Sequence, residues 1–100
     1  MKLAKVIGKV VATVRSDRLG MDKLALIKFI DQSGKEEPSV AVAVDKLGAG
    51  EGEWVLVVGG SSARMSVDDH GKSPVDLSVV GIVDEVTSDK STWFQKNQAG

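Results

Sequence analysis

The apolar residues of this chain follow the two-residue period of a β-strand over much of its length. Residues 3–14 alternate between a series that is wholly apolar or glycine and a series that carries Lys5 and Lys9. This alternation predicts one long strand whose apolar face lines the interior, and Gly8 in its middle predicts a bend. The same pattern predicts strands at residues 24–30, 40–44, 53–58 and 77–86, and a short last strand at 91–94.

The segments between these strands have the composition of turns. Residues 31–38 contain Gly34, which supplies the positive backbone angle that a tight turn needs. Residues 61–65 can form one helical turn with a serine near its start as N-cap. About five short strands joined in this way predict an all-β fold, a small, partly open Greek-key, OB-like β-barrel with one short helix. We expect residues 1–100 to form a single domain, with 91–100 as a partly mobile C-terminal tail.

Three of the predicted strands are apolar at every position, which a lone barrel does not require. Residues 40–44, 55–58 and 79–83 contain no polar side chain. A strand with one face in a core and the other in water alternates, so continuous apolar strands need cover on both faces. An internal sandwich could provide that cover, although the chain is short for it and has no amphipathic helix to serve instead. We therefore expect another copy of the chain to cover these strands, which predicts a symmetric oligomer.

Composition and charge exclude several functional classes. The chain has 13 basic and 14 acidic residues, and no basic block is present to neutralise phosphates. The absence of cysteine excludes disulfides and thiolate metal sites, and one histidine is too few for a multi-histidine site. Lys5 and Lys9 interrupt the apolar run of a signal peptide, and every uncharged apolar stretch is too short to span a membrane. We expect a cytoplasmic protein without metal or cofactor.

The glycine-rich segment at residues 48–52 is the first candidate for chemistry. It reads G-A-G-E-G, whereas a dinucleotide-binding loop reads G-x-G-x-x-G and leads into a helix. Here the third glycine comes one position early, a strand follows, and Glu51 and Glu53 would repel a phosphate. No Gly-Lys-Ser/Thr ending is present either, so these glycines predict a tight turn.

The serines at residues 61 and 62 are the second candidate. Ser62 lies two positions after Gly60, as the nucleophile does in a G-x-S-x-G elbow, but Arg64 stands where the second glycine should be. An esterase built on Ser62 would need His70 as its base, and His70→Ala would then abolish turnover. The preferred interpretation is that small residues permit close backbone approach and that Arg64 pairs with an acid, within the subunit or across an interface.

Metal and nucleic-acid sites have weaker support in the sequence. Asp68, Asp69 and His70 are adjacent on a polar loop, and adjacent residues seldom converge on one ion. Small Greek-key barrels bind single-stranded nucleic acid through a basic groove with stacking aromatic residues. The four aromatic residues of this chain lie outside any basic strand, and its net charge is −1. A nucleic-acid- or ligand-binding barrel is nevertheless the alternative from a different class.

Three segments in a specific order resemble one family of structural proteins. The chain reads D-K-L-G-A-G-E-G-E-W-V-L-V at 45–57, G-S-S-A-R at 60–64 and P-V-D-L-S-V-V-G-I-V-D at 74–84. Together with residues 1–15 and 23–31, this combination resembles the vertex proteins of bacterial microcompartment shells, most closely the ethanolamine-utilisation and carboxysome types. The resemblance covers nearly the whole chain, and residues 66–72 and the C-terminal tail are its variable parts.

The resemblance implies a non-enzymatic barrel that assembles into a cyclic pentamer. Such pentamers would occupy the corners of a polyhedral shell in the cytoplasm, because flat sheets of hexameric shell proteins cannot close without fivefold units. It implies no cofactor, nucleic acid or membrane. Carried onto this chain, it places the glycine loop and the G-S-S-A-R turn near subunit contacts or the fivefold axis, and the last apolar strand in the seam. The implied interface or pore-rim residues are Gly48, Gly50, Gly52, Ser61, Ser62, Arg64, Val79, Val80, Ile82 and Val83.

Overall fold

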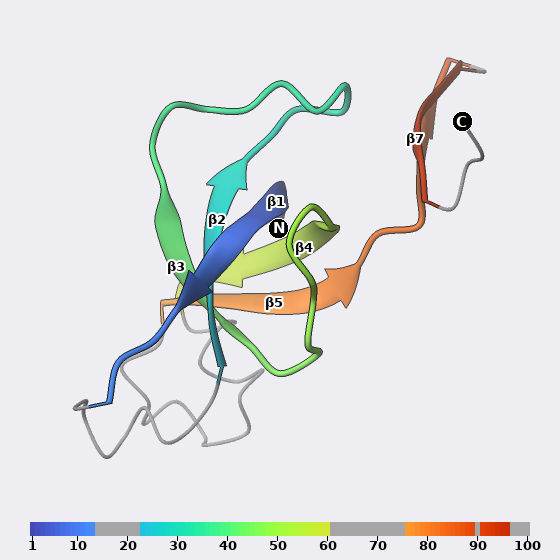
Figure 1. Cartoon of the computed structure of the whole chain (residues 1–100). Helices are drawn as coiled ribbons and strands as arrows, with labels where there is room; N and C mark the ends of the chain where they lie inside the picture. Colours follow the sequence, from blue (N-terminus) through green and yellow to red (C-terminus); the bar gives the residue numbers. More distant parts are fainter. Residues whose placement is uncertain (14–22, 61–75, 90, 97–100) are drawn as a thin grey trace.

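The computed structural model describes residues 1–13, 23–60, 76–89 and 91–96. These residues contain seven strands. Two of them, β6 (Glu85–Ser88) and β7 (Ser91–Gln95), form a hairpin that stands beside the other five (Figure 1). The other five form a barrel, which confirms the predicted all-β, OB-like fold, although the barrel is closed and not partly open as expected. They are β1 (Lys2–Val10), β2 (Lys23–Phe29), β3 (Ala41–Asp45), β4 (Trp54–Gly59) and β5 (Leu77–Ile82).

The barrel closes because β1 is paired on both of its edges. The order around the barrel is β1-β2-β3-β5-β4, and β4 returns to β1 in antiparallel register with Ala4 opposite Val55. The pair of β3 and β5 is parallel, and the other barrel pairs are antiparallel. Closure removes the free strand edges that an open sheet would present to other chains.

Small aliphatic side chains fill the interior of the barrel. They come from alternate positions of the strands, as the two-residue period predicted. Burial of each valine or isoleucine stabilises the fold by roughly 1.5–3 kcal/mol. The core residues, each at most 4% exposed, are Ala4, Val6, Ala25, Ile27, Ala43, Val55, Val57 and Val79.

Two irregularities in strand pairing accompany the curvature of the sheet. The register of β1 shifts between Val6 and Gly8, so that Ile7 is an extra residue opposite β2. This coincides with the bend that Gly8 predicted. A second shift, between β4 and β5, leaves Val80 as the extra residue of β5. Bulges of this kind increase local twist and help a short sheet to curve into a barrel.

Two predicted strands have the wrong bounds. The strand expected at 3–14 ends at Val10, because the ladder with β2 ends there and residues 11–13 pair with no described strand. The strand expected at 77–86 is two strands, separated by Val83 and Asp84. The backbone N–H of Val83 donates to the carbonyl of Trp54, the first residue of β4, so β5 has no partner strand beyond this point. Continuous apolar residues indicated burial but not the position where the chain leaves the barrel.

The remaining strand predictions agree with β2, β3, β4 and β7 to within one residue at each end. The helical turn expected at residues 61–65 lies outside the described residues, as do Asp68, Asp69 and His70. A search of the described residues finds no helix of the length and apolarity that a membrane crossing requires.

Candidate functional site

The glycine loop, residues 46–53 between β3 and β4, is anchored by the carboxylate that precedes it. Asp45 is only 3% exposed, and its Oδ1 accepts hydrogen bonds from the backbone N–H groups of Leu47 and Gly48, both at 3.0 Å. Its Oδ2 accepts a third from the N–H of Ala49 at 2.8 Å. An aspartate that receives several local N–H groups stabilises a turn, and its charge strengthens each bond.

A second carboxylate closes the other end of the loop. Glu53 Oε1 accepts a hydrogen bond from the N–H of Gly50 at 2.6 Å, and Oε2 accepts one from Lys96 Nζ, also at 2.6 Å. The Gly50 N–H and then the Lys96 ammonium hold the pKa of Glu53 below its ordinary value. The hydrogen bond to Glu53 raises the pKa of Lys96.

These contacts decide between the two interpretations of the glycine-rich segment. A phosphate-binding loop directs several backbone N–H groups at its ligand. Here the N–H groups of residues 47–50 all donate to Asp45 or Glu53. The structure therefore agrees with the predicted tight turn and not with a phosphate cradle.

Two of the three glycines of this loop are favoured by the backbone conformation of the single chain. Gly48 and Gly52 have φ angles of 76° and 90°, in the left-handed region that side chains disfavour. A Cβ at either position would meet nothing within 4 Å, whereas one at Gly50 would lie 3.4 Å from Glu53 Oε1. None of the described residues crowds Gly48 or Gly52, and their placement at a subunit contact stays a prediction.

Apolar side chains lie exposed on β3, on β5 and on the segments beside them. Val40 is 54% exposed, Val42 42%, Leu47 51% and Val80 37%. Val42 lies opposite Leu26 of β2, which is half-buried, so the apolar face continues across two strands. The exposed residues on β3 and β5 agree with two of the three strands for which the sequence predicted uncovered apolar surface, and exposed apolar surfaces mark interaction sites. The prediction was wrong for residues 55–58, because Val55 and Val57 lie in the barrel core and Leu56 packs against a second buried cluster.

The four residues expected to form the apolar seam do not share one face. Val79 belongs to the barrel core, and Val83 is buried in a second cluster. Ile82 is half-buried against the core, whereas Val80 projects to the exterior. Val80 is therefore the one of the four with a side chain well exposed for a neighbouring copy. The other expected site residues, Ser61, Ser62 and Arg64, lie outside the described residues.

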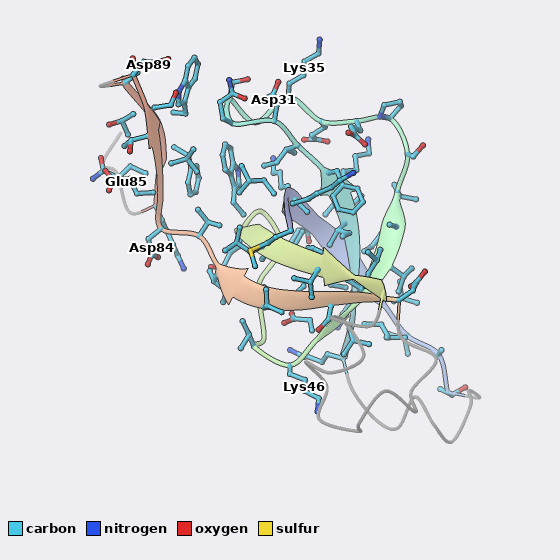
Figure 2. All side chains as sticks on the ribbon, turned by 180° about the vertical axis from the view of Figure 1, so that it is seen from behind. Asp31, Lys35, Lys46, Asp84, Glu85 and Asp89 are labelled. Atoms are coloured by element: carbon cyan, nitrogen blue, oxygen red, sulfur yellow. The ribbon has the colours of Figure 1, made fainter. Side chains whose placement is uncertain are left out.

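The hairpin carries an exposed aromatic side chain in acidic surroundings. Trp93 is 44% exposed, and its indole N–H donates to Ser88 Oγ at 2.8 Å. Figure 2 shows Asp84, Glu85 and Asp89 along the same hairpin. A nucleic-acid site needs stacking residues beside cations. The described cation of this hairpin, Lys96 at its base, is paired with Glu53.

The described part of the chain offers little for catalysis. It has no cluster of three or more metal-ligating side chains. An open pocket of about 670 Å³ lies where β1 ends and β2 begins, and its described carboxylates are Asp45 and Glu51. Asp45 cannot readily act as a base there, because both of its oxygens hold the glycine loop.

Comparison with known proteins identifies the family. Residues 1–84 match the family described as "Ethanolamine utilisation protein EutN/carboxysome". The chain is 52% identical over 96 residues to the bacterial microcompartment shell vertex protein EutN of Escherichia coli strain K12, across 96% of this chain and 100% of that protein.

Solved structures agree. The structure is similar to that of CcmL from Gloeobacter violaceus, with a TM-score of 0.90 and 38% identity across 98% of this chain and 100% of the other. GrpN, a pentameric microcompartment shell protein from Rhodospirillum rubrum, matches with a TM-score of 0.79 and 42% identity, across 88% of this chain and 99% of the other. The chain therefore shares its fold and much of its sequence with these proteins, and it belongs to the EutN/CcmL family.

Proposed function

We propose that this chain is a non-enzymatic vertex protein of a bacterial microcompartment shell and that five copies assemble into a ring. The observation that carries the proposal is 52% identity, across 96% of the chain, to a protein named as a shell vertex protein. The similarity to a solved pentameric shell protein supports the number five.

The surface of the barrel supports assembly into a ring. A cyclic ring is held by heterologous contacts, in which one face of a subunit meets a different face of its neighbour. The apolar side chains of Val42 and Val80 lie on β3 and β5, which are adjacent in the barrel, and the described residues leave them 42% and 37% exposed. We assign this surface to the subunit seam. The glycine loop and residues Ser61, Ser62 and Arg64 are assigned to the interface or pore rim.

A fivefold ring has a defined place among hexameric partners. Hexagonal tiles form flat sheets, and a polyhedron closes when fivefold units replace hexagons at its corners. The proposed partners are therefore hexameric shell proteins, and the proposed location is the shell of a microcompartment in the cytoplasm. The whole chain, 1–100, acts as one vertex domain in this proposal.

The chemistry of the loop supports a structural role rather than catalysis. Asp45 before the loop and Glu53 at its end are two of its three carboxylates, and their four oxygens accept hydrogen bonds from backbone N–H groups or from Lys96. The third, Glu51, is exposed. Groups that are fixed in this way stabilise the conformation of the loop.

The proposal is tested by production of hexameric shell proteins with and without this chain, followed by electron microscopy. We expect closed polyhedra with the chain and open or elongated sheets without it. Val42→Lys places a charge in the proposed seam and should also give open or elongated sheets. Gln32→Lys, in the exposed turn, should give closed polyhedra. Closed polyhedra at equal frequency without the chain would overturn the proposal.

A further inference from the structure

The β6–β7 hairpin depends on the barrel for its position. A two-stranded sheet alone is marginally stable in water, and no pairing between described strands joins this hairpin to the barrel. Its main contact is the ring of Phe94, which stacks on Trp54 of β4 with centroids 4.1 Å apart and planes at 12°. Val86 and Phe94 pack against the buried cluster of Ile30, Trp54 and Val83.

Lys96, directly after β7, adds two polar contacts at the base of the hairpin. Its backbone N–H donates to the carbonyl of Asp84 at 2.7 Å, which joins the two ends of the hairpin. Its ammonium donates to Glu53 Oε2 at 2.6 Å, which joins the hairpin to the barrel. The side chains of Lys96 and Glu53 are 35% and 24% exposed, so this ion pair is partly shielded from water.

Glu53 is also the residue that closes the glycine loop, through Oε1 and the N–H of Gly50. Its own carbonyl accepts a hydrogen bond from the N–H of Val6 at 2.9 Å, which fixes its backbone on β1. One carboxylate, on a fixed backbone, therefore contacts the loop with one oxygen and the hairpin with the other.

We propose that Glu53 is a positioning residue that couples docking of the β6–β7 hairpin to the conformation of the glycine loop. Lys96 holds the carboxylate in the rotamer that aims Oε1 at Gly50, so the docked hairpin stabilises the closed loop. By reciprocity, the closed loop stabilises the docked hairpin. A partner that lifts the hairpin would thereby loosen the loop, although it never touches the loop. The coupling is a property of the single chain and does not depend on the proposed assembly.

Amide hydrogen exchange resolved by NMR on the full chain tests this coupling. Lys96→Met removes the ammonium and retains much of the aliphatic stem, and it leaves Glu53 and Gly50 unaltered. We expect the Gly50 N–H to exchange about two- to fivefold faster, as loss of a partly exposed ion pair implies. Amides of β1 should keep their rates, which separates local opening from global destabilisation.

Lys28→Met is the matched control. Lys28 lies 3.7 Å from Glu36 and is 28% exposed, so this variant also breaks an ion pair that is partly exposed. Their ion pair lies apart from the contact between Gly50 and Glu53 that closes the glycine loop. We expect wild-type exchange at Gly50 in this variant. Faster exchange at Gly50 in both variants would show a nonspecific loss of stability and would overturn the proposal.

Added salt provides a second test that does not alter the sequence. An increase from about 0.05 M to about 0.5 M KCl screens partly exposed ion pairs. The Gly50 N–H should then exchange faster in the wild type and show no further change in Lys96→Met. If Lys96→Met accelerates exchange in the hairpin but leaves Gly50 at the wild-type rate, the hairpin and the loop are independent and the proposal is wrong.

Discussion

The closed barrel and the β6–β7 hairpin are both β-structure, but they are held in place by different means. The barrel is paired around its whole circumference, and Ile27 and Val55 in its core are fully buried. Among the described residues, the hairpin has two strands and is held to the barrel by the stack of Phe94 on Trp54, the packing of Val86 against a small buried cluster and the ion pair of Lys96 with Glu53. The barrel can therefore be altered at many surface positions without loss of fold, whereas the position of the hairpin depends on a few contacts.

This difference also concerns what each region can do. A barrel with few free edges and a buried core is a rigid unit that suits a ring of defined geometry. A segment attached by few contacts opens at lower free energy and can respond to a partner. The glycine loop lies between the two regions, because Asp45 fixes one end to β3 and Glu53 links the other end to the hairpin.

The largest expected effect is in the barrel core. Ile27→Ala should lower the free energy of unfolding by about 3 kcal/mol, because it leaves a cavity among fully buried neighbours. Val86→Ala at the half-buried face of the hairpin should cost about 1 kcal/mol and act locally. Denaturant unfolding at a fixed chain concentration measures both, and equal losses would contradict the distinction between the two regions.

Substitution of two glycines with nearly the same φ angle distinguishes the cost of backbone strain from the cost of crowding by a neighbouring side chain. Gly34, at φ 89°, would place a Cβ 2.7 Å from Trp54 Cζ2, whereas a Cβ at Gly52, at φ 90°, would meet nothing within 4 Å. We expect Gly34→Ala to cost about 2 kcal/mol and Gly52→Ala about 1 kcal/mol in thermal or denaturant unfolding. If Gly52→Ala lowers the free energy of unfolding by more than about 1 kcal/mol, and only in the assembled protein, Gly52 lies at a subunit contact.

Loss of the aromatic stack should release the hairpin and spare the barrel. Phe94→Ala removes a ring contact worth about 1 kcal/mol beyond its buried area. Amides of β6 and β7 should therefore exchange faster while those of β1 keep their rates. Thr92→Ala, at an exposed position of the same strand, is the control. Faster exchange throughout the barrel in Phe94→Ala would mean that the hairpin is part of the same cooperative unit.

The smallest effect is a pH dependence of hairpin docking. The pKa of Glu53 is lowered from its ordinary value of 4.5, so the carboxylate stabilises the docked state above pH 4.5 and loses this effect as pH falls through the lowered pKa. The pKa of Lys96 is raised from 10.5, so its contribution is present below pH 10.5 and is lost as pH rises through the raised pKa.

Amide exchange in β7 across pH, corrected for the intrinsic rate, measures this window. Glu53→Gln should remove the acidic limb of the profile, with Asp84 left as the nearby charge that acts on Lys96. An acidic limb of unchanged size in Glu53→Gln would assign the pH dependence to another group.

Much of the barrel could be predicted from the sequence, since the alternation of apolar residues reports which side of each strand is buried. The end of β5 before Val83 and Asp84 could not be predicted, because residues 79–83 are apolar throughout. The strand ends there because Val83 donates to the carbonyl of Trp54 at the start of β4, a contact between segments far apart in the sequence. For the same reason, the predicted seam included Val79, whose side chain lies in the core, together with Val80, which the bulge turns outward.

The role of Glu53 was also hidden in the sequence. Its proximity to three glycines indicated a residue that repels phosphate, whereas the structure shows a carboxylate that accepts bonds from Gly50 and Lys96. Lys96 is 43 positions away along the chain, and no local pattern connects such residues. The one indication in the sequence was an acidic residue, Glu53, directly before β4. Its role became clear only from the position of the hairpin, which brings Lys96 to its carboxylate.

The mass of the intact assembly tests the central claim most directly. Native mass spectrometry of the full chain at dilute concentration should show a dominant species of five copies, and Val42→Lys should shift the population toward smaller species while Gln32→Lys should not. A monomer that persists as concentration rises, or a dominant ring of another size, would contradict the account of this chain as a fivefold vertex.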